Sequence, residues 1–189
     1  MKVIPFFSSE KLLIEKASYG NRSAQQRLFN LHAPKMLSVC RQYLPELQRA
    51  EEAMCNGFLK VFKNLKSFKH EGSFEGWVRR IMVRESISYL RSEKKLRFTE
   101  VEIDDNLQVY DPAVNDLEVE EIQRLIDSLP DGYRAVFVLY AVEGYQHNEI
   151  AEMLEITEST SKSQLYKARK KLQMLLKTLN MYQDGTHEI

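Results

Sequence analysis

A run near the end of the chain, residues 159–178, combines small hydroxyl side chains with six basic residues and no acidic residue. Hydroxyl groups can bond base edges in the major groove of DNA, and Lys and Arg neutralise phosphates. The run therefore predicts contact with a nucleic acid. The residues that we expect to make this contact are Ser159, Thr160, Lys162, Ser163, Tyr166, Lys167, Lys170 and Lys171.

The residues around this run predict a helix-turn-helix. A short helix over 147–154 and a longer helix over 158–179 each have an apolar face, and residues 155–157 form a tight turn between them. Two positions depart from the usual pattern: Glu155 stands where Gly is common, and Ser161 stands where an apolar residue is usual. We expect poorer packing at Ser161 unless its hydroxyl finds a partner. The alternative is an ordinary helical hairpin with a solvated basic face.

A second group of basic residues recurs along an expected helix, 74–95, beside three aromatic residues. Aromatic rings beside basic residues can bind an unstacked base of a nucleic acid. Removing the base from its stack costs a few kcal/mol, which stacking on the rings and contacts in a pocket can offset. For Trp77, packing in the core is nevertheless favoured over direct stacking on a base. The group contains Phe68, Phe74 and Trp77 with Arg79, Arg80, Arg84 and Arg91.

No pattern of residues indicates catalysis. There is no Gly-rich phosphate loop, no HExxH and no Ser/His/Asp motif. Glu51 and Glu52 have no second carboxylate or His pair at ligand spacing nearby. Cys40 and Cys55 form no CxxC, so we expect two reduced thiols. We therefore predict no enzyme activity, no metal and no cofactor.

The charge is unevenly distributed along the 189 residues, although the net charge is zero. Residues 1–98 sum to +10, residues 99–121 to −9 and residues 122–189 to −1. Two basic regions separated by an acidic strip suggest two contacts with a polyanion. Ordinary local imbalance on a solvated surface is the alternative.

The hydrophobic periodicity is helical almost throughout, and we predict an all-α protein. Two small helical domains, 8–95 and 117–180, would be joined by an acidic flexible linker, 96–116. No apolar run is long enough to cross a membrane, so we expect a cytoplasmic protein. The expected helices run from Ser8 or Ser9 to about Gly20, from a cap at Asn21 through a break or kink at Pro34 towards Pro45, and over 47–65, 74–95, 117–129, 131–144, 147–154 and 158–179.

Four stretches together resemble bacterial RNA polymerase sigma factors of the extracytoplasmic-function (ECF) group. They are RAEEAMCNGFLKVFKNLKSF at 49–68, GSFEGWVRRI at 72–81, SYLRSEKK at 88–95, and residues 128–172. The resemblance implies a sigma-2-like domain that binds core polymerase and recognises and melts the −10 element. It also implies a sigma-4-like helix-turn-helix domain that recognises the −35 element.

The resemblance also implies site residues. The loop 67–74 would form the pocket for a flipped base of the non-template strand. Core polymerase would contact Glu51, Glu52, Asn56 and Lys60. The −10 element would contact Ser67, Lys69, His70, Trp77, Arg79, Arg80, Arg84, Arg91, Lys94 and Lys95.

Three residues depart from the family pattern. Arg84 stands where the family often has Asn, and Ser88 stands where it often has Asp, which favours phosphate contact over base-specific contact. Gln146 stands where Ser or Thr usually caps a helix, and this cap should be weaker.

The implied partners are core RNA polymerase, promoter DNA and an anti-sigma factor, without membrane insertion. We expect a monomer when free, because no heptad is sustained. The acidic linker would follow a polymerase channel, fold back on the basic domain, or act only as a solvated tether. Three other classes remain: a helix-turn-helix regulator without polymerase, a helical hydrolase or nuclease, and a structural adaptor.

Overall fold

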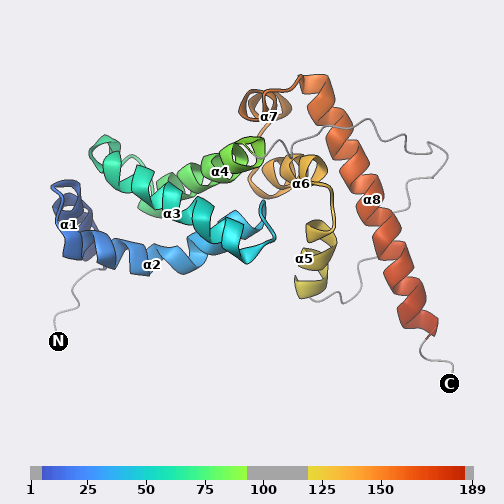
Figure 1. Cartoon of the computed structure of the whole chain (residues 1–189), viewed down its shortest axis with the longest axis horizontal. Coiled ribbons are helices and arrows are strands. Elements are labelled where there is room, and N and C mark those ends of the chain that lie inside the picture. Colours follow the sequence, from blue (N-terminus) through green and yellow to red (C-terminus); the bar gives the residue numbers. More distant parts are fainter. Residues whose placement is uncertain (1–5, 93–118, 186–189) are drawn as a thin grey trace. The chain divides into compact units, whose positions relative to one another are not determined.

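The computed structural model describes residues 6–92 and 119–185, and these ranges contain helices and no strand. The all-α prediction is therefore confirmed. The chain divides into two compact units between Tyr89 and Leu90 (Figure 1). The predicted acidic linker, 96–116, lies outside the described residues.

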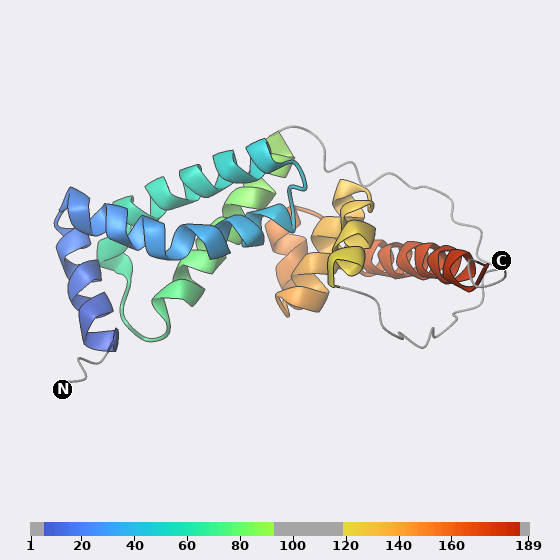
Figure 2. The same cartoon turned by 90° about the horizontal axis from the view of Figure 1, so that it is seen from below.

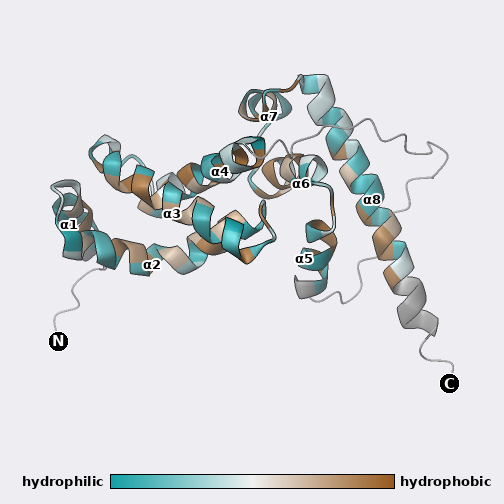
Figure 3. Ribbon diagram, viewed as in Figure 1, coloured by the Kyte–Doolittle hydropathy of each residue, from teal (hydrophilic) through white to brown (hydrophobic). Residues whose placement is uncertain are grey.

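The first unit is built on α2 (Arg22–Arg41), which packs against α1 (Phe6–Ser18) on one side and α3 (Leu47–Lys63) on the other (Figure 2). A short 3-10 turn, η1 (Leu65–Ser67), and a loop lead into α4 (Phe74–Ser92). Hydrophobic residues recur along each helix (Figure 3), and those that are buried form the core. Fully buried members of this core are Leu28, Met36, Val61, Val78 and Met82.

The helix boundaries of the first unit differ from expectation in two places. The predicted cap at Asn21 is confirmed, because its Oδ1 accepts a hydrogen bond from the backbone N–H of Ala24 at 3.0 Å. The cap at Ser8 or Ser9 is wrong, since α1 already begins at Phe6, one residue after a proline. Of the break or kink expected at Pro34, the break is wrong. The helix α2 continues through the proline, because His32 before it and Met36 after it are buried in the same core.

The second unit contains α5 (Val119–Asp127), α6 (Asp131–Phe137), a π-helical turn η2 (Val138–Val142), α7 (His147–Leu154) and α8 (Glu158–Gly185). Helices α5, α6 and α7 all pack against α8. Ala168 of α8 is fully buried. It packs in a hydrophobic cluster with Leu129, Tyr133, Phe137 and Leu172.

A buried arginine joins α5 to α6. The Nη1 of Arg134 donates hydrogen bonds to the carbonyl oxygens of Asp127 at 3.1 Å and Leu129 at 2.8 Å, and Nη2 pairs with the carboxylate of Asp131. The predicted cap at Asp131 is wrong, since Pro130 is the N-cap and Asp131 is the first residue of α6. Its carboxylate instead neutralises Arg134, whose side chain is only 4% exposed.

Both cysteines are free thiols. Cys40 is buried, and burial raises its pKa to about 11, so this thiol stays protonated at neutral pH. Cys55 is exposed on α3.

Candidate nucleic-acid interface

The turn between α7 and α8 is held by backbone geometry on one side and by a cap on the other. Glu155 takes the left-handed conformation, with φ at 56°, and its N–H is bonded to carbonyls of the last turn of α7. Thr157 then caps α8, because its Oγ1 accepts a hydrogen bond from the N–H of Thr160 at 3.0 Å. The predicted tight turn at 155–157 thus has glutamate at the position that glycine usually takes.

We expect Glu155→Gly to stabilise the protein by about 0.5–1 kcal/mol, because glycine adopts positive φ without a side-chain clash. Urea unfolding followed by circular dichroism measures the difference. The matched control is Glu152→Gly, which lies three residues earlier in the same helix at an exposed position. That change should destabilise by roughly 1 kcal/mol. Equal effects of the two substitutions would contradict the prediction.

The helix-turn-helix has a polar contact at its crossing. Ser161 is fully buried, and its Oγ lies 2.9 Å from Nδ1 of His147, the first residue of α7. The His147 ring stacks on Tyr140 with centroids 4.7 Å apart, and the guanidinium of Arg169 lies 5.6 Å from the centroid of Tyr140. The hydroxyl of Ser161 therefore has the partner that its burial requires. The contact between His147 and Ser161, with His147 stacked on Tyr140, takes the place of the apolar packing that is usual at this position.

We expect Ser161→Ala to destabilise the protein by about 1–2 kcal/mol, because the substitution removes the partner of a partly buried imidazole. Urea unfolding of Ser161→Ala, His147→Ala and the double variant forms a thermodynamic cycle. The coupling free energy should be about 1 kcal/mol. The control is Ser159→Ala, an exposed serine of the same helix, which should change stability by less than about 0.5 kcal/mol. A coupling of zero would show that the two side chains act independently.

The N-terminal cap of α7 differs from the Ser or Thr that is usual in the family. Gln146 is its N-cap, and the Glu149 carboxylate accepts a hydrogen bond from the backbone N–H of Gln146 at 2.7 Å. This is the glutamate arm of a capping box.

The outer face of α8 carries most of the residues that we predict to meet the −35 element, but not the buried Lys170. A rotation of about 100° per residue places Ser159, Ser163 and Tyr166 along the middle of this face. Lys162 lies at one edge of it, and Lys167 and Lys171 lie at the other. Thr160 is partly exposed and bonds Thr157. Lys170 is buried, with Nζ 5.9 Å from the centroid of the Tyr166 ring.

One of the exposed lysines is paired. Lys162 Nζ lies 2.7 Å from Oε1 of Glu158 one turn earlier. The hydrogen bond and charge of Lys162 hold the pKa of the Glu158 carboxyl below its usual range. Because both side chains are exposed, a phosphate can displace this pair at little cost.

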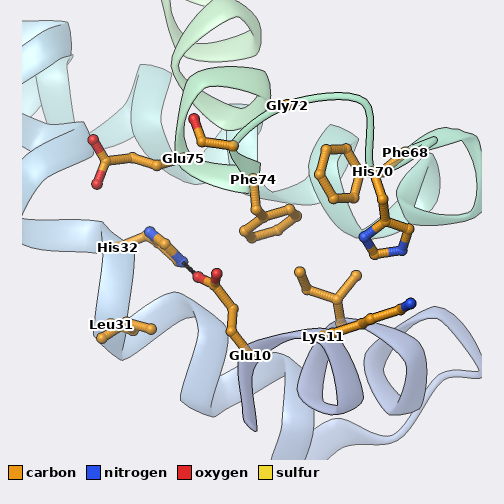
Figure 4. A pocket seen from close by; sticks show the side chains of 11 residues that line it. Glu10, Lys11, Leu31, His32, Phe68, His70, Gly72, Phe74 and Glu75 are labelled. Carbon is orange, nitrogen blue, oxygen red and sulfur yellow. Dashed lines mark ion pairs between the residues drawn. The ribbon is translucent and has the colours of Figure 1, made fainter. Parts of the chain in front are cut away.

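In the first unit, the loop between η1 and α4 forms the wall of a pocket of about 410 Å³ (Figure 4). Phe74 lies between the loop aromatics and His32, whose Nε2 is 3.3 Å from Oε1 of Glu10. His70 in the loop has φ at 59°. The pocket is lined by Glu10, Lys11, Ile14, Leu31, His32, Phe68, His70, Gly72, Ser73, Phe74 and Glu75.

Four rings form a connected cluster at this pocket. Phe68 contacts His70, Phe74 and Trp77, with centroid separations of 4.6, 5.3 and 5.5 Å. Phe74 is buried, whereas Trp77 is partly exposed and does not line the pocket. The Trp77 ring contacts the rings of Phe68 and Phe74 and keeps part of its surface exposed. Ser67 and Lys69 are exposed on either side of Phe68.

The arginines of α4 present a basic edge beyond the pocket. Arg80, Arg84 and Arg91 are exposed, and Arg79 is partly exposed. Ser88 is exposed on the same helix. The predicted contacts Lys94 and Lys95 lie outside the described residues.

The four residues predicted to meet core polymerase are all exposed on α3, but two of them are tied to α4. Lys60 pairs with the carboxylate of Glu85, and the hydroxyl of Tyr89 lies 3.2 Å from Oε2 of Glu52. These interactions brace α3 against α4. Glu51 and Asn56 are exposed on the same helix.

One residue of that face was missed from the sequence. Leu59 is 68% exposed, next to the predicted set. Its position off the apolar stripe of α3 was the signal available in the sequence. Large exposed apolar side chains beside polar ones are typical of interface anchors.

Within the described ranges, no group of three or more potential metal ligands comes together. No helix in those ranges is long and apolar enough to span a bilayer.

Comparison with known families decides the assignment. Residues 28–96 match the family model of sigma-70 region 2, and residues 119–172 match that of sigma-70 region 4. The chain belongs to the sigma-70 family, in its ECF group. As a sigma factor, it directs promoter-specific transcription initiation by RNA polymerase.

Curated ECF relatives cover nearly the whole sigma factor. ECF RNA polymerase sigma factor SigW of Bacillus subtilis is 27% identical over 182 residues, which is 89% of this chain and 97% of SigW. SigM of Mycobacterium tuberculosis is 29% identical over 164 residues, which is 85% of this chain and 81% of SigM. The fold resembles that of sigma factor RpoE from Bartonella quintana, solved with the anti-sigma factor NepR. The TM-score is 0.50 at 18% identity, over 80% of this chain and 96% of RpoE.

Proposed function

We propose that α7 and α8 of this sigma factor read the −35 element. The observation that carries this role is the layout of the outer face of α8. Hydroxyl groups lie along its middle, where a helix in the major groove meets base edges, and lysines lie at both edges, where the two phosphate strands run. The contact between His147 of α7 and Ser161 of α8 ties these two helices together.

We propose that the loop 67–73 and α4 bind the −10 element and assist strand opening. The pocket at the loop has the size of a small-molecule site, and the rings of Phe68, His70 and Phe74 line it. Aromatic contact offsets part of the few kcal/mol that extruding a base costs. The exposed arginines of α4 supply phosphate contacts next to it.

We propose that exposed residues of α3 contact core polymerase. Glu51 and Asn56 would contact the enzyme directly, with Leu59 as an apolar anchor. Glu52 and Lys60 would have to give up their contacts with α4 before they could bind the polymerase. In this role the protein is an initiation factor without an enzyme activity of its own, and it works in the cytoplasm with the polymerase. An anti-sigma factor is a further proposed partner, since the similar RpoE was solved with one.

The test is an abortive-transcription assay with core polymerase, the full chain and a pool of random promoters, followed by sequencing of the active templates. We expect transcription downstream of paired −35 and −10 elements. The variants Ser163→Ala and His70→Ala should relax the selection at the −35 and −10 elements, respectively. Failure to bind core polymerase, together with DNA binding by the chain alone, would instead support a free-standing regulator.

A further inference from the structure

A second hollow adjoins the pocket of Figure 4 in the first unit. It has a volume of about 600 Å³ and lies between α1 and η1. Its lining shares Lys11, Ile14, Phe68 and His70 with the first pocket, so Phe68 and His70 form a wall common to both. The other lining residues are Glu15, Ser18, Tyr19, Leu65 and Lys66.

Tyr19 is the unusual feature of this hollow. It follows the last turn of α1, directly before Gly20 with φ at 83°, and its side chain is 78% exposed. A ring this exposed is available to stack on a ligand. The ammonium of Lys66 lies 5.6 Å from the centroid of the Tyr19 ring and leaves most of the ring accessible.

The charges of the hollow suit a nucleotide. Lys11 and Lys66 bring two cations and Glu15 brings one anion, so that cations outnumber anions around an exposed ring. An aromatic platform beside cations is the combination that binds single-stranded nucleic acid, with a base on the ring and a phosphate at the ammonium groups.

We propose that this second hollow takes another unstacked nucleotide of the same DNA strand whose flipped base enters the first pocket. The base stacks on Tyr19, and Lys66 and Lys11 meet the adjoining phosphate. The inference rests on the proposed −10 role of the loop. It adds α1 to the elements that hold the opened strand, because the wall of Phe68 and His70 separates two sites that are next to one another.

The test uses the holoenzyme and forked templates whose −10 strand is unpaired, with an abasic nucleotide placed at each unpaired position in turn. On the intact fork, Tyr19→Ala should weaken binding roughly ten-fold, and Tyr19→Phe should not. The difference in affinity between Tyr19→Ala and the wild type should vanish when the abasic nucleotide occupies one particular position, because that template has no base to stack on the ring. Lys66→Ala should reduce the slope of the log binding constant against log salt concentration by roughly 0.7, the value expected for one phosphate of a single strand.

The matched control is Lys16→Ala, which removes an exposed lysine of α1 that lines neither hollow and should leave binding unchanged. If the wild-type holoenzyme does not prefer the fork to the matched duplex, the −10 role fails and this inference fails with it. If the fork is preferred but Tyr19→Ala has no effect, or the same effect on every abasic template, only the inference is overturned. Weaker binding of Tyr19→Ala to core polymerase would assign the hollow to a protein contact and would also overturn it.

Discussion

Replacing Arg134 by Met is expected to destabilise the second unit by about 3–5 kcal/mol, which is enough to unfold a marginal domain. The substitution leaves the carbonyl oxygens of Asp127 and Leu129 without their donor and leaves the Asp131 carboxylate without its cation. A guanidinium at the C-terminal end of α5 is also favoured by the helix dipole. Methionine fills the volume but satisfies none of these groups.

Hydrogen exchange measured by mass spectrometry resolves the effect along the chain. Protection should be lost over 119–179 and kept over 6–89, because the two units have separate cores. The matched control is Arg41→Met, an exposed arginine of α2, which should change neither range. Uniform loss of protection in both units would show that they unfold together, contrary to this prediction.

The triple variant Lys162→Ala, Lys167→Ala and Lys171→Ala should weaken holoenzyme binding to a promoter that depends on its −35 element. On duplex DNA, the slope of log binding constant against log salt falls by about 0.9 for each phosphate that a lysine no longer neutralises. Three such phosphates correspond to a weakening of binding on the order of a hundred-fold at 0.1 M salt. Fluorescence anisotropy over a salt series gives the slope and the affinity together.

The control for this variant is Lys177→Ala, which removes an exposed lysine farther along α8. It should leave the slope unchanged within error. Circular dichroism must show that the triple variant keeps its helix content, since exposed Lys→Ala changes are compatible with a helix. An unchanged salt slope in the folded triple variant would remove these lysines from the DNA interface.

Several features were predictable because they depend on neighbours in the sequence. The cap at Asn21 and the turn after α7 follow from residue types within four positions of each other. The three–four spacing of apolar residues predicted nearly every helix. The break expected from the proline at Pro34 does not occur, because His32 and Met36 on either side of it are buried. The cap expected at Asp131 does not form, because the Asp131 carboxylate pairs with a buried arginine.

By itself, the sequence determined an all-α chain with a helix-turn-helix, two basic regions and the pattern of an ECF sigma factor, since helical period, charge and motif order are local properties. The tertiary structure decided which side chains meet. Ser161 finds His147 across 14 residues and Lys60 finds Glu85 across 25, while Phe68 and His70 meet α1 to form two adjoining hollows. Such pairings depend on how helices cross, and the crossing is set by packing over the whole core, which no short stretch of sequence contains.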